Sequence, residues 1–141
     1  MINFLDPIAT KIFVSIYNQL NAAGCLTLDN ANGVHEPLQV KKLDEISLHS
    51  KKLERISFGH YYEDGGKIMA DPEMIFLFNP DYPEKIAPCF FKMDALGKIE
   101  NSIIFNEDGN TIEIRTKMQK GHTAFADVWM NSIMKQQSIL I

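Results

Sequence analysis

The segment from residue 56 to residue 78 constrains the fold more than any other part of the sequence. Its first half alternates between two sets of side chains, which is the period of a β-strand. The two sets are Ile56, Phe58, His60 and Tyr62 on one face, and Ser57, Gly59, Tyr61 and Glu63 on the other. Gly65-Gly66 follows, and two glycines fit a two-residue hairpin loop because both positions favour positive φ. The sequence therefore predicts an antiparallel hairpin that returns from Ile68 to Phe78.

The loop also predicts which side chains face each other across this hairpin. With two loop residues, Asp64 pairs with Lys67. The same register gives three further pairs, namely Tyr62–Met69, His60–Asp71 and Phe58–Glu73. Pro72 cannot donate a ladder hydrogen bond, so it marks a bulge or a sheet edge. A bulge at Pro72 would shift the register beyond it.

The predicted His60–Asp71 pair is the strongest candidate for chemistry in the chain. A histidine held by a carboxylate serves as a general base, and the two side chains also serve as metal ligands. Together with Glu73, and with Glu63 as a further carboxylate, they would suit a small metal-dependent hydrolase or a nucleotide-processing enzyme. The other interpretation is structural, with the imidazole held by the carboxylate at a sheet face. Because the spacing fixes no third ligand or nucleophile, the structural interpretation is favoured.

Helical patterns lie near both ends of the sequence. Asp6 fits an N-cap, Pro7 the first helical position, and Gly24 the residue after the helix. Apolar residues between them recur at three- and four-residue steps, as on one helix face. These are Ile8, Ile12, Phe13, Ile16 and Leu20. The second pattern predicts a helix from Thr123, as its cap, to Gln137. One face of that helix carries Phe125, Val128, Trp129, Ile133 and Gln136.

Strand patterns and polar turns occupy the rest of the chain. Besides the hairpin, strands are expected at 37–43, 87–93, 98–105 and 111–117, and a polar loop at 28–33. Five or six antiparallel strands with a helix at each end predict an α+β fold. We expect both helices to cover one face of the sheet, which leaves the other face solvated or available for binding.

Length and composition restrict the function classes. A chain of 141 residues fits a single domain, 1–141. A formal net charge of −4 without a basic cluster argues against nucleic-acid binding, although Tyr61 and Tyr62 on a strand would suit base stacking. No apolar run approaches the ~20 residues of a membrane helix, and no secretory leader is visible. Cys25 and Cys89 have no metal or redox spacing, so a cytoplasmic protein without metal or cofactor is expected.

Several other side chains have ordinary structural interpretations. The two cysteines are expected to be buried thiols, and Trp129 is expected to anchor the core. His35, His49 and His122 fall in loops or at element ends and match no metal-binding spacing. The terminal segment Ser138–Ile141 is apolar for a chain end. It would extend a strand, pack on the domain or contact a partner, and it could form a homo-oligomer together with the C-terminal helix.

Several motifs resemble those of a known family. They are His60-Tyr61-Tyr62-Glu63, Asp71-Pro72-Glu73-Met74, Asp29-Asn30-Ala31 and Phe125-Ala126-Asp127-Val128-Trp129. The chain thus resembles a family of small uncharacterised proteins of bacteria and their phages, a domain of unknown function. The resemblance extends over most of the chain. It departs at 51–55 and 82–94, and Gly65-Gly66 stands where the family often has Asn-Gly.

This resemblance implies an accessory protein of a mobile element or phage, and it supplies no catalytic residues. Such proteins commonly act by binding another protein, with counter-defence among their roles. The expected function is therefore non-enzymatic protein binding, and the metal-dependent hydrolase or nucleotide-processing enzyme is the alternative. The candidate binding surface consists of His60, Tyr61, Tyr62, Glu63, Asp71 and Glu73.

Overall fold

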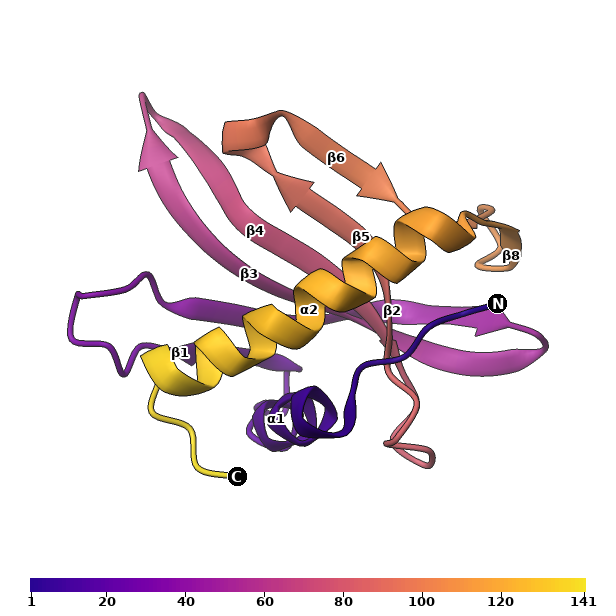
Figure 1. Cartoon of the computed structure of the whole chain (residues 1–141), viewed down its shortest axis with the longest axis horizontal. Helices are drawn as coiled ribbons and strands as arrows, with labels where there is room; N and C mark the ends of the chain where they lie inside the picture. The colour runs from indigo at the N-terminus through magenta and orange to yellow at the C-terminus, as the bar shows by residue number, and fades with distance from the viewer.

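Six antiparallel strands form a twisted sheet, and two helices lie across one of its faces (Figure 1). This is a computed structural model, and it describes all of residues 1–141. The strand order in space follows the order in the chain. The strands are β1 (Cys25–Leu28), β2 (Leu38–Leu48), β3 (Lys51–Asp64), β4 (Lys67–Phe78), β5 (Ala87–Met93) and β6 (Lys98–Asn101). A separate ribbon of β7 (Ile103–Phe105) and β8 (Thr111–Ile114) completes the predicted α+β fold.

The first helix, α1 (Pro7–Tyr17), begins where the sequence predicts and ends earlier. The Asp6 carboxylate accepts a hydrogen bond from the Ala9 amide at 2.7 Å, as an N-cap does. The helix stops at Tyr17, well before Gly24. The Asn21 side chain accepts hydrogen bonds from the amides of residues 23 and 25, and so forms a turn that the apolar pattern does not reveal.

The second helix, α2 (Thr116–Gln136), begins earlier than predicted. Thr123 is not its cap, because its hydroxyl lies within the helix and donates to the carbonyl of Gln119 at 2.8 Å. Phe125 and Val128, expected on the buried face, are 36% and 69% exposed. The buried face carries several polar residues and consists of Gln119, His122, Thr123, Ala126, Trp129, Met130 and Ile133. Trp129 is 7% exposed and anchors the core, as predicted.

Apolar side chains pack on both faces of the sheet. The main core lies under the helices, where the Phe13 and Phe58 rings stack at 4.9 Å between centroids. A second core of Ile46, Leu48, Leu77, Cys89 and Ile103 lies on the other face, against the β7–β8 ribbon. In β2, a bulge between Lys42 and Asp44 moves the apolar positions from one face to the other. The face without helices is therefore only partly free.

The chain crosses from one sheet to the other at Ser102, which splits the predicted strand 98–105. Ser102 is fully buried, and its amide and carbonyl bond to Cys89 and Arg115. The sequence also misses β1, and β2 extends past residue 43 while β8 ends before residue 117. Cys89 is buried as expected, whereas Cys25 is only half-buried.

The C-terminal segment packs back on the domain in part. Ile139 contacts the main core, and its amide donates to the Met134 carbonyl at 2.9 Å. Leu140 and Ile141 remain 93% and 59% exposed. Neither helix has the length and apolar character that crossing a membrane requires.

Candidate functional site

A bulge changes the register of the β3–β4 hairpin at the residues that the sequence singles out. Next to the loop the prediction is confirmed, because Asp64 pairs with Lys67 and Tyr62 with Met69. Further along, the ladder passes from Tyr61–Ala70 to Gly59–Glu73 and Phe58–Met74. Asp71 and Pro72 together therefore oppose the single residue His60, and the Asp71–Pro72 peptide bond is cis. The predicted His60–Asp71 and Phe58–Glu73 pairs are wrong, since Pro72 has no N–H to donate to a regular ladder.

His60 faces the helices and not a carboxylate. Its side chain is 8% exposed, and its ring packs edge-on against Trp129 with 5.7 Å between centroids. Nδ1 lies 3.2 Å from the Pro37 carbonyl oxygen, an acceptor, so Nδ1 carries the proton. Nε2 is then a buried acceptor without a partner, which costs about 1–3 kcal/mol. Asp71 is exposed and forms no ion pair.

Tyr61 and Glu73 meet on the opposite face of the sheet. The Tyr61 hydroxyl donates to Glu73 Oε1 at 2.7 Å. The ring of Tyr61 lies over Gly59, where a Cβ would collide with both ring and hydroxyl. Burial, and then the hydrogen bond to Glu73, raise the pKa of Tyr61 well above its usual range. The protonated phenol holds Glu73 in place through this hydrogen bond.

The structure separates the side chains of the hydrolase interpretation. His60 faces the helices, Glu73 faces the other way, and Asp71 is exposed at the bulge. No three His, Cys, Asp or Glu side chains lie close enough together to hold a metal ion. His60, Asp71 and Glu73 therefore do not form a shared metal-binding or catalytic site.

The end of the hairpin extends beyond the body of the sheet (Figure 1). Apolar side chains are exposed there, with Ile68 69% exposed and Leu96 of the short helix η1 (Asp94–Leu96) 63% exposed. Acidic side chains surround them. We call this region the hairpin surface, and it covers both faces of the hairpin end: Tyr62 and Met69 lie on one face, and Glu63 and Ile68 lie on the other. Asp71 at the bulge and Leu96 on η1 complete it.

The outer edge of β4 at this surface is closed to a further strand. The Ala70 amide donates to Asp94 Oδ2 at 2.7 Å, and Lys92 Nζ lies 3.8 Å from Asp94 Oδ1. Pro72, two residues along, has no amide hydrogen. An inward-pointing carboxylate and a proline are common protections of a sheet edge. A partner strand therefore cannot be added at this edge of β4.

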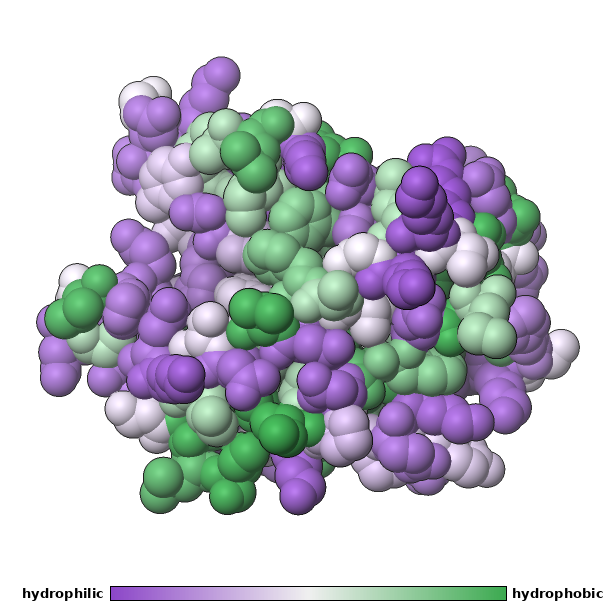
Figure 2. Space-filling model, viewed as in Figure 1, coloured by the Kyte–Doolittle hydropathy of each residue, from purple (hydrophilic) through white to green (hydrophobic).

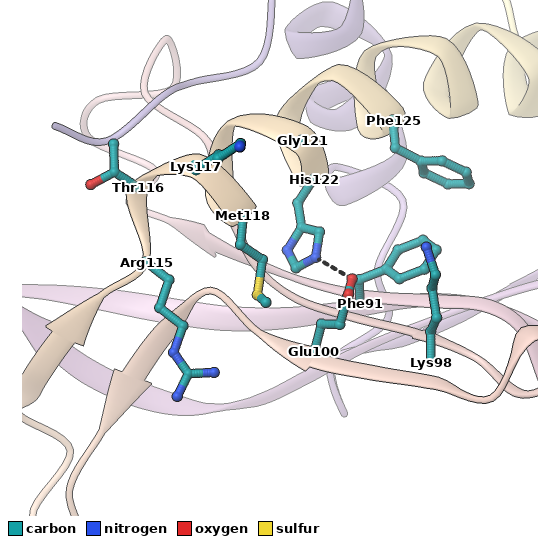
Figure 3. A pocket seen from close by; sticks show the side chains of 10 residues that line it. All are labelled: Phe91, Lys98, Glu100, Arg115, Thr116, Lys117, Met118, Gly121, His122 and Phe125. Atoms are coloured by element: carbon teal, nitrogen blue, oxygen red, sulfur yellow. Dashed lines mark hydrogen bonds and ion pairs between the residues drawn. The ribbon is translucent and has the colours of Figure 1, made fainter.

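A pocket of about 690 Å³ lies between the start of α2 and strands β5 and β6 (Figure 3). At its inner wall His122 is 5% exposed, and its Nε2 donates to Glu100 Oε1 at 3.0 Å. The Ser102 hydroxyl lies 3.0 Å from Nδ1 and fixes the ring from behind. Ser102 is fully buried, so this serine–histidine–glutamate trio offers no accessible nucleophile.

The comparison with protein families covers both the hairpin and this pocket. The profile of a family described as "Domain of unknown function (DUF6908)" matches residues 9–139. The chain belongs to the DUF6908 family. The expected membership of a family of unknown function is thereby confirmed. No curated protein and no solved structure matches this DUF6908 chain.

Sequence reasoning on the DUF6908 domain selected the hairpin and missed the pocket. Of the six selected residues, Tyr62, Glu63 and Asp71 lie at the hairpin surface. Tyr61 and Glu73 form a pair on the sheet face, and His60 is in the core. The pocket was missed because the predicted helix begins after His122, and because Glu100 and Ser102 fall within the predicted strand 98–105, which contains no motif.

Proposed function

We propose that this DUF6908 domain is an accessory protein of a mobile element or phage that acts by binding another protein through the hairpin surface. The resemblance described above supports the setting. The exposure of Ile68 at the end of a projecting hairpin is the observation that carries the mode of action. Counter-defence is one role that such binding would serve.

The apolar part of the hairpin surface gives a partner something to bury. Ile68 and Leu96 lie on neighbouring elements, because η1 is joined to β4 through Asp94 and Ala70. In Figure 2 an apolar area runs from α2 in the middle of the view to the end of the sheet formed by β4, β5 and β6. Full burial of one isoleucine side chain is worth about 1.5–3 kcal/mol, so a few such contacts support specific binding.

The charges around this apolar centre indicate the chemistry of the partner. Glu63, Asp64 and Asp71 are exposed carboxylates that form no ion pair, and Lys67 is the one basic residue among them. A complementary surface would have an apolar centre with lysines and arginines around it. We therefore expect binding that weakens as salt is added, because such charges are screened in solution.

The test compares two isoleucines that are similarly exposed and lie on the β3–β4 hairpin and on the β7–β8 ribbon. Ile68 on β4 and Ile112 on β8 are 69% and 62% exposed. Wild type, Ile68→Asp and Ile112→Asp are immobilised and presented with an extract of the native host. Retained proteins are quantified by mass spectrometry, and the protein retained by wild type is then purified and titrated calorimetrically against all three.

The proposal predicts one protein that wild type and Ile112→Asp retain and that Ile68→Asp loses. In the titration, Ile68→Asp weakens binding by at least about tenfold, which corresponds to the loss of one buried isoleucine. Equal binding by Ile68→Asp and Ile112→Asp would overturn the assignment of the surface. If no protein is retained by wild type and lost from Ile68→Asp, the proposed function is overturned.

A further inference from the structure

The pocket between α2 and strands β5 and β6 has an apolar wall in which Phe91 is buried, at 6% exposed, while Phe125 and Met118 reach the solvent. Phe91 and Phe125 meet edge to face with 5.0 Å between ring centroids, and His122 stacks on Phe91 at 5.5 Å. Met118 lines the same wall, and Phe125 is 36% exposed. Aromatic rings with an open edge or face bind flat apolar groups by stacking and by exclusion of water.

Cationic side chains flank this wall from two elements. Lys98 comes from β6, and Arg115 and Lys117 come from the start of α2 (Figure 3). Neither Lys98 nor Lys117 forms an ion pair, whereas Arg115 pairs with exposed Glu113 at 2.9 Å. Three cations around one pocket are notable in a chain whose net charge is −4.

The start of α2 adds to this positive potential. Arg115 at the N-cap position makes no side-chain cap, and no acidic residue lies in the first turn. Cations at a helix N-terminus are unfavourable by themselves, and an anion bound there reverses the sign of that interaction. Glu100 is the one carboxylate that lines the pocket, and it accepts the hydrogen bond from His122.

From this arrangement we infer that the pocket binds a small organic anion with a flat apolar body, such as an aryl phosphate or a mononucleotide. The exposed ring of Phe125, which packs on the buried Phe91, holds the body beside Met118, and the positive potential of Lys98, Lys117 and the start of α2 attracts the anionic group. The volume of about 690 Å³ lies within the range of small-molecule sites. The inference is independent of the hairpin surface, because the two regions share no residue.

The experiment follows amide chemical shifts by NMR during titration with three probes: phenyl phosphate, adenosine 5′-monophosphate and inorganic phosphate. We expect saturable shifts at Gly121, His122 and Phe91 with phenyl phosphate, and much weaker binding of inorganic phosphate, which lacks the apolar body. Tighter binding of the nucleotide than of phenyl phosphate identifies a nucleotide site. The opposite order identifies a smaller aromatic anion, and either order supports the inference.

Matched variants locate the charge that matters. The double variant Lys98→Gln/Lys117→Gln is expected to weaken phenyl phosphate binding by about tenfold, the sum of two exposed charges. Lys120→Gln, on the same helix and outside the pocket, serves as the control and leaves binding unchanged. The same spectra show whether each variant is folded. Absence of saturable shifts with both aryl probes, equal binding of inorganic phosphate, or equal loss in Lys120→Gln would each overturn the inference.

Discussion

Gly59 makes room for the Tyr61 ring, and replacement of this glycine by alanine tests that packing. The new Cβ would collide with the ring and hydroxyl, so Tyr61 has to turn away and release Glu73. A hydrogen bond to a carboxylate contributes about 1.5–3 kcal/mol. Alanine recovers about 0.5–1 kcal/mol relative to glycine in a strand, where Gly59 has no positive φ. The displaced Tyr61 ring also exposes apolar area, which adds to the loss. The free energy of unfolding should therefore fall by about 2 kcal/mol in Gly59→Ala.

The same substitution is expected to change sign when the tyrosine is removed first. In Tyr61→Ala the space above Gly59 is open, so Gly59→Ala should stabilise by about 0.5–1 kcal/mol. Urea denaturation followed by the fluorescence of Trp129, the single tryptophan and 7% exposed, measures all four proteins of the cycle. If Gly59→Ala destabilises equally in both backgrounds, the close approach of Tyr61 to Gly59 does not exist.

Three further outcomes follow from the structure. Folding raises the pKa of Tyr61, so the stability linked to this group is complete below the usual tyrosine pKa of about 10 and is lost as the pH rises above it. In urea titrations at alkaline pH, wild type should therefore lose stability more steeply than Tyr61→Phe. Burial raises the pKa of the Cys89 thiol to about 12, and a thiol reagent at pH 8 should modify this cysteine only on unfolding, as peptide mapping would show. Deletion of the two exposed C-terminal residues should change the melting temperature little, whereas also deleting Ile139 should lower it by several degrees in calorimetry.

Structural features that depend on residues adjacent in the chain could be predicted from the sequence. Asp6 and Pro7 mark the start of α1, and Gly65-Gly66 marks the hairpin loop, because caps and two-residue loops depend on local backbone chemistry. The alternation around the hairpin likewise indicates which strands have a buried face. The register beyond the bulge could not be derived in this way. Pro72 indicates an irregularity in the strand. That Asp71 and Pro72 both oppose His60, however, depends on how the rest of β4 packs.

The start of α2 and its pocket depend on partners that are distant in the sequence. The Gln119 side chain bonds to the backbone of Asn3 and Pro88, and His122 bonds to Glu100 and Ser102. Tertiary hydrogen bonds satisfy these polar groups and allow them on a buried helix face. The regular apolar pattern therefore begins several residues after Thr116, the first residue of α2, and it predicts a helix start that is too late.

Site-specific photo-cross-linking in the native host tests the central claim, that the hairpin surface binds a protein, most directly. A photoreactive amino acid replaces Ile68 in one variant and Ile112 in the other, since both side chains are exposed and lie on the β3–β4 hairpin and on the β7–β8 ribbon. The account predicts that irradiation joins position 68 to one protein species, with no equivalent product from position 112. Cross-linking of the same proteins from both positions, or no product from position 68, would contradict it.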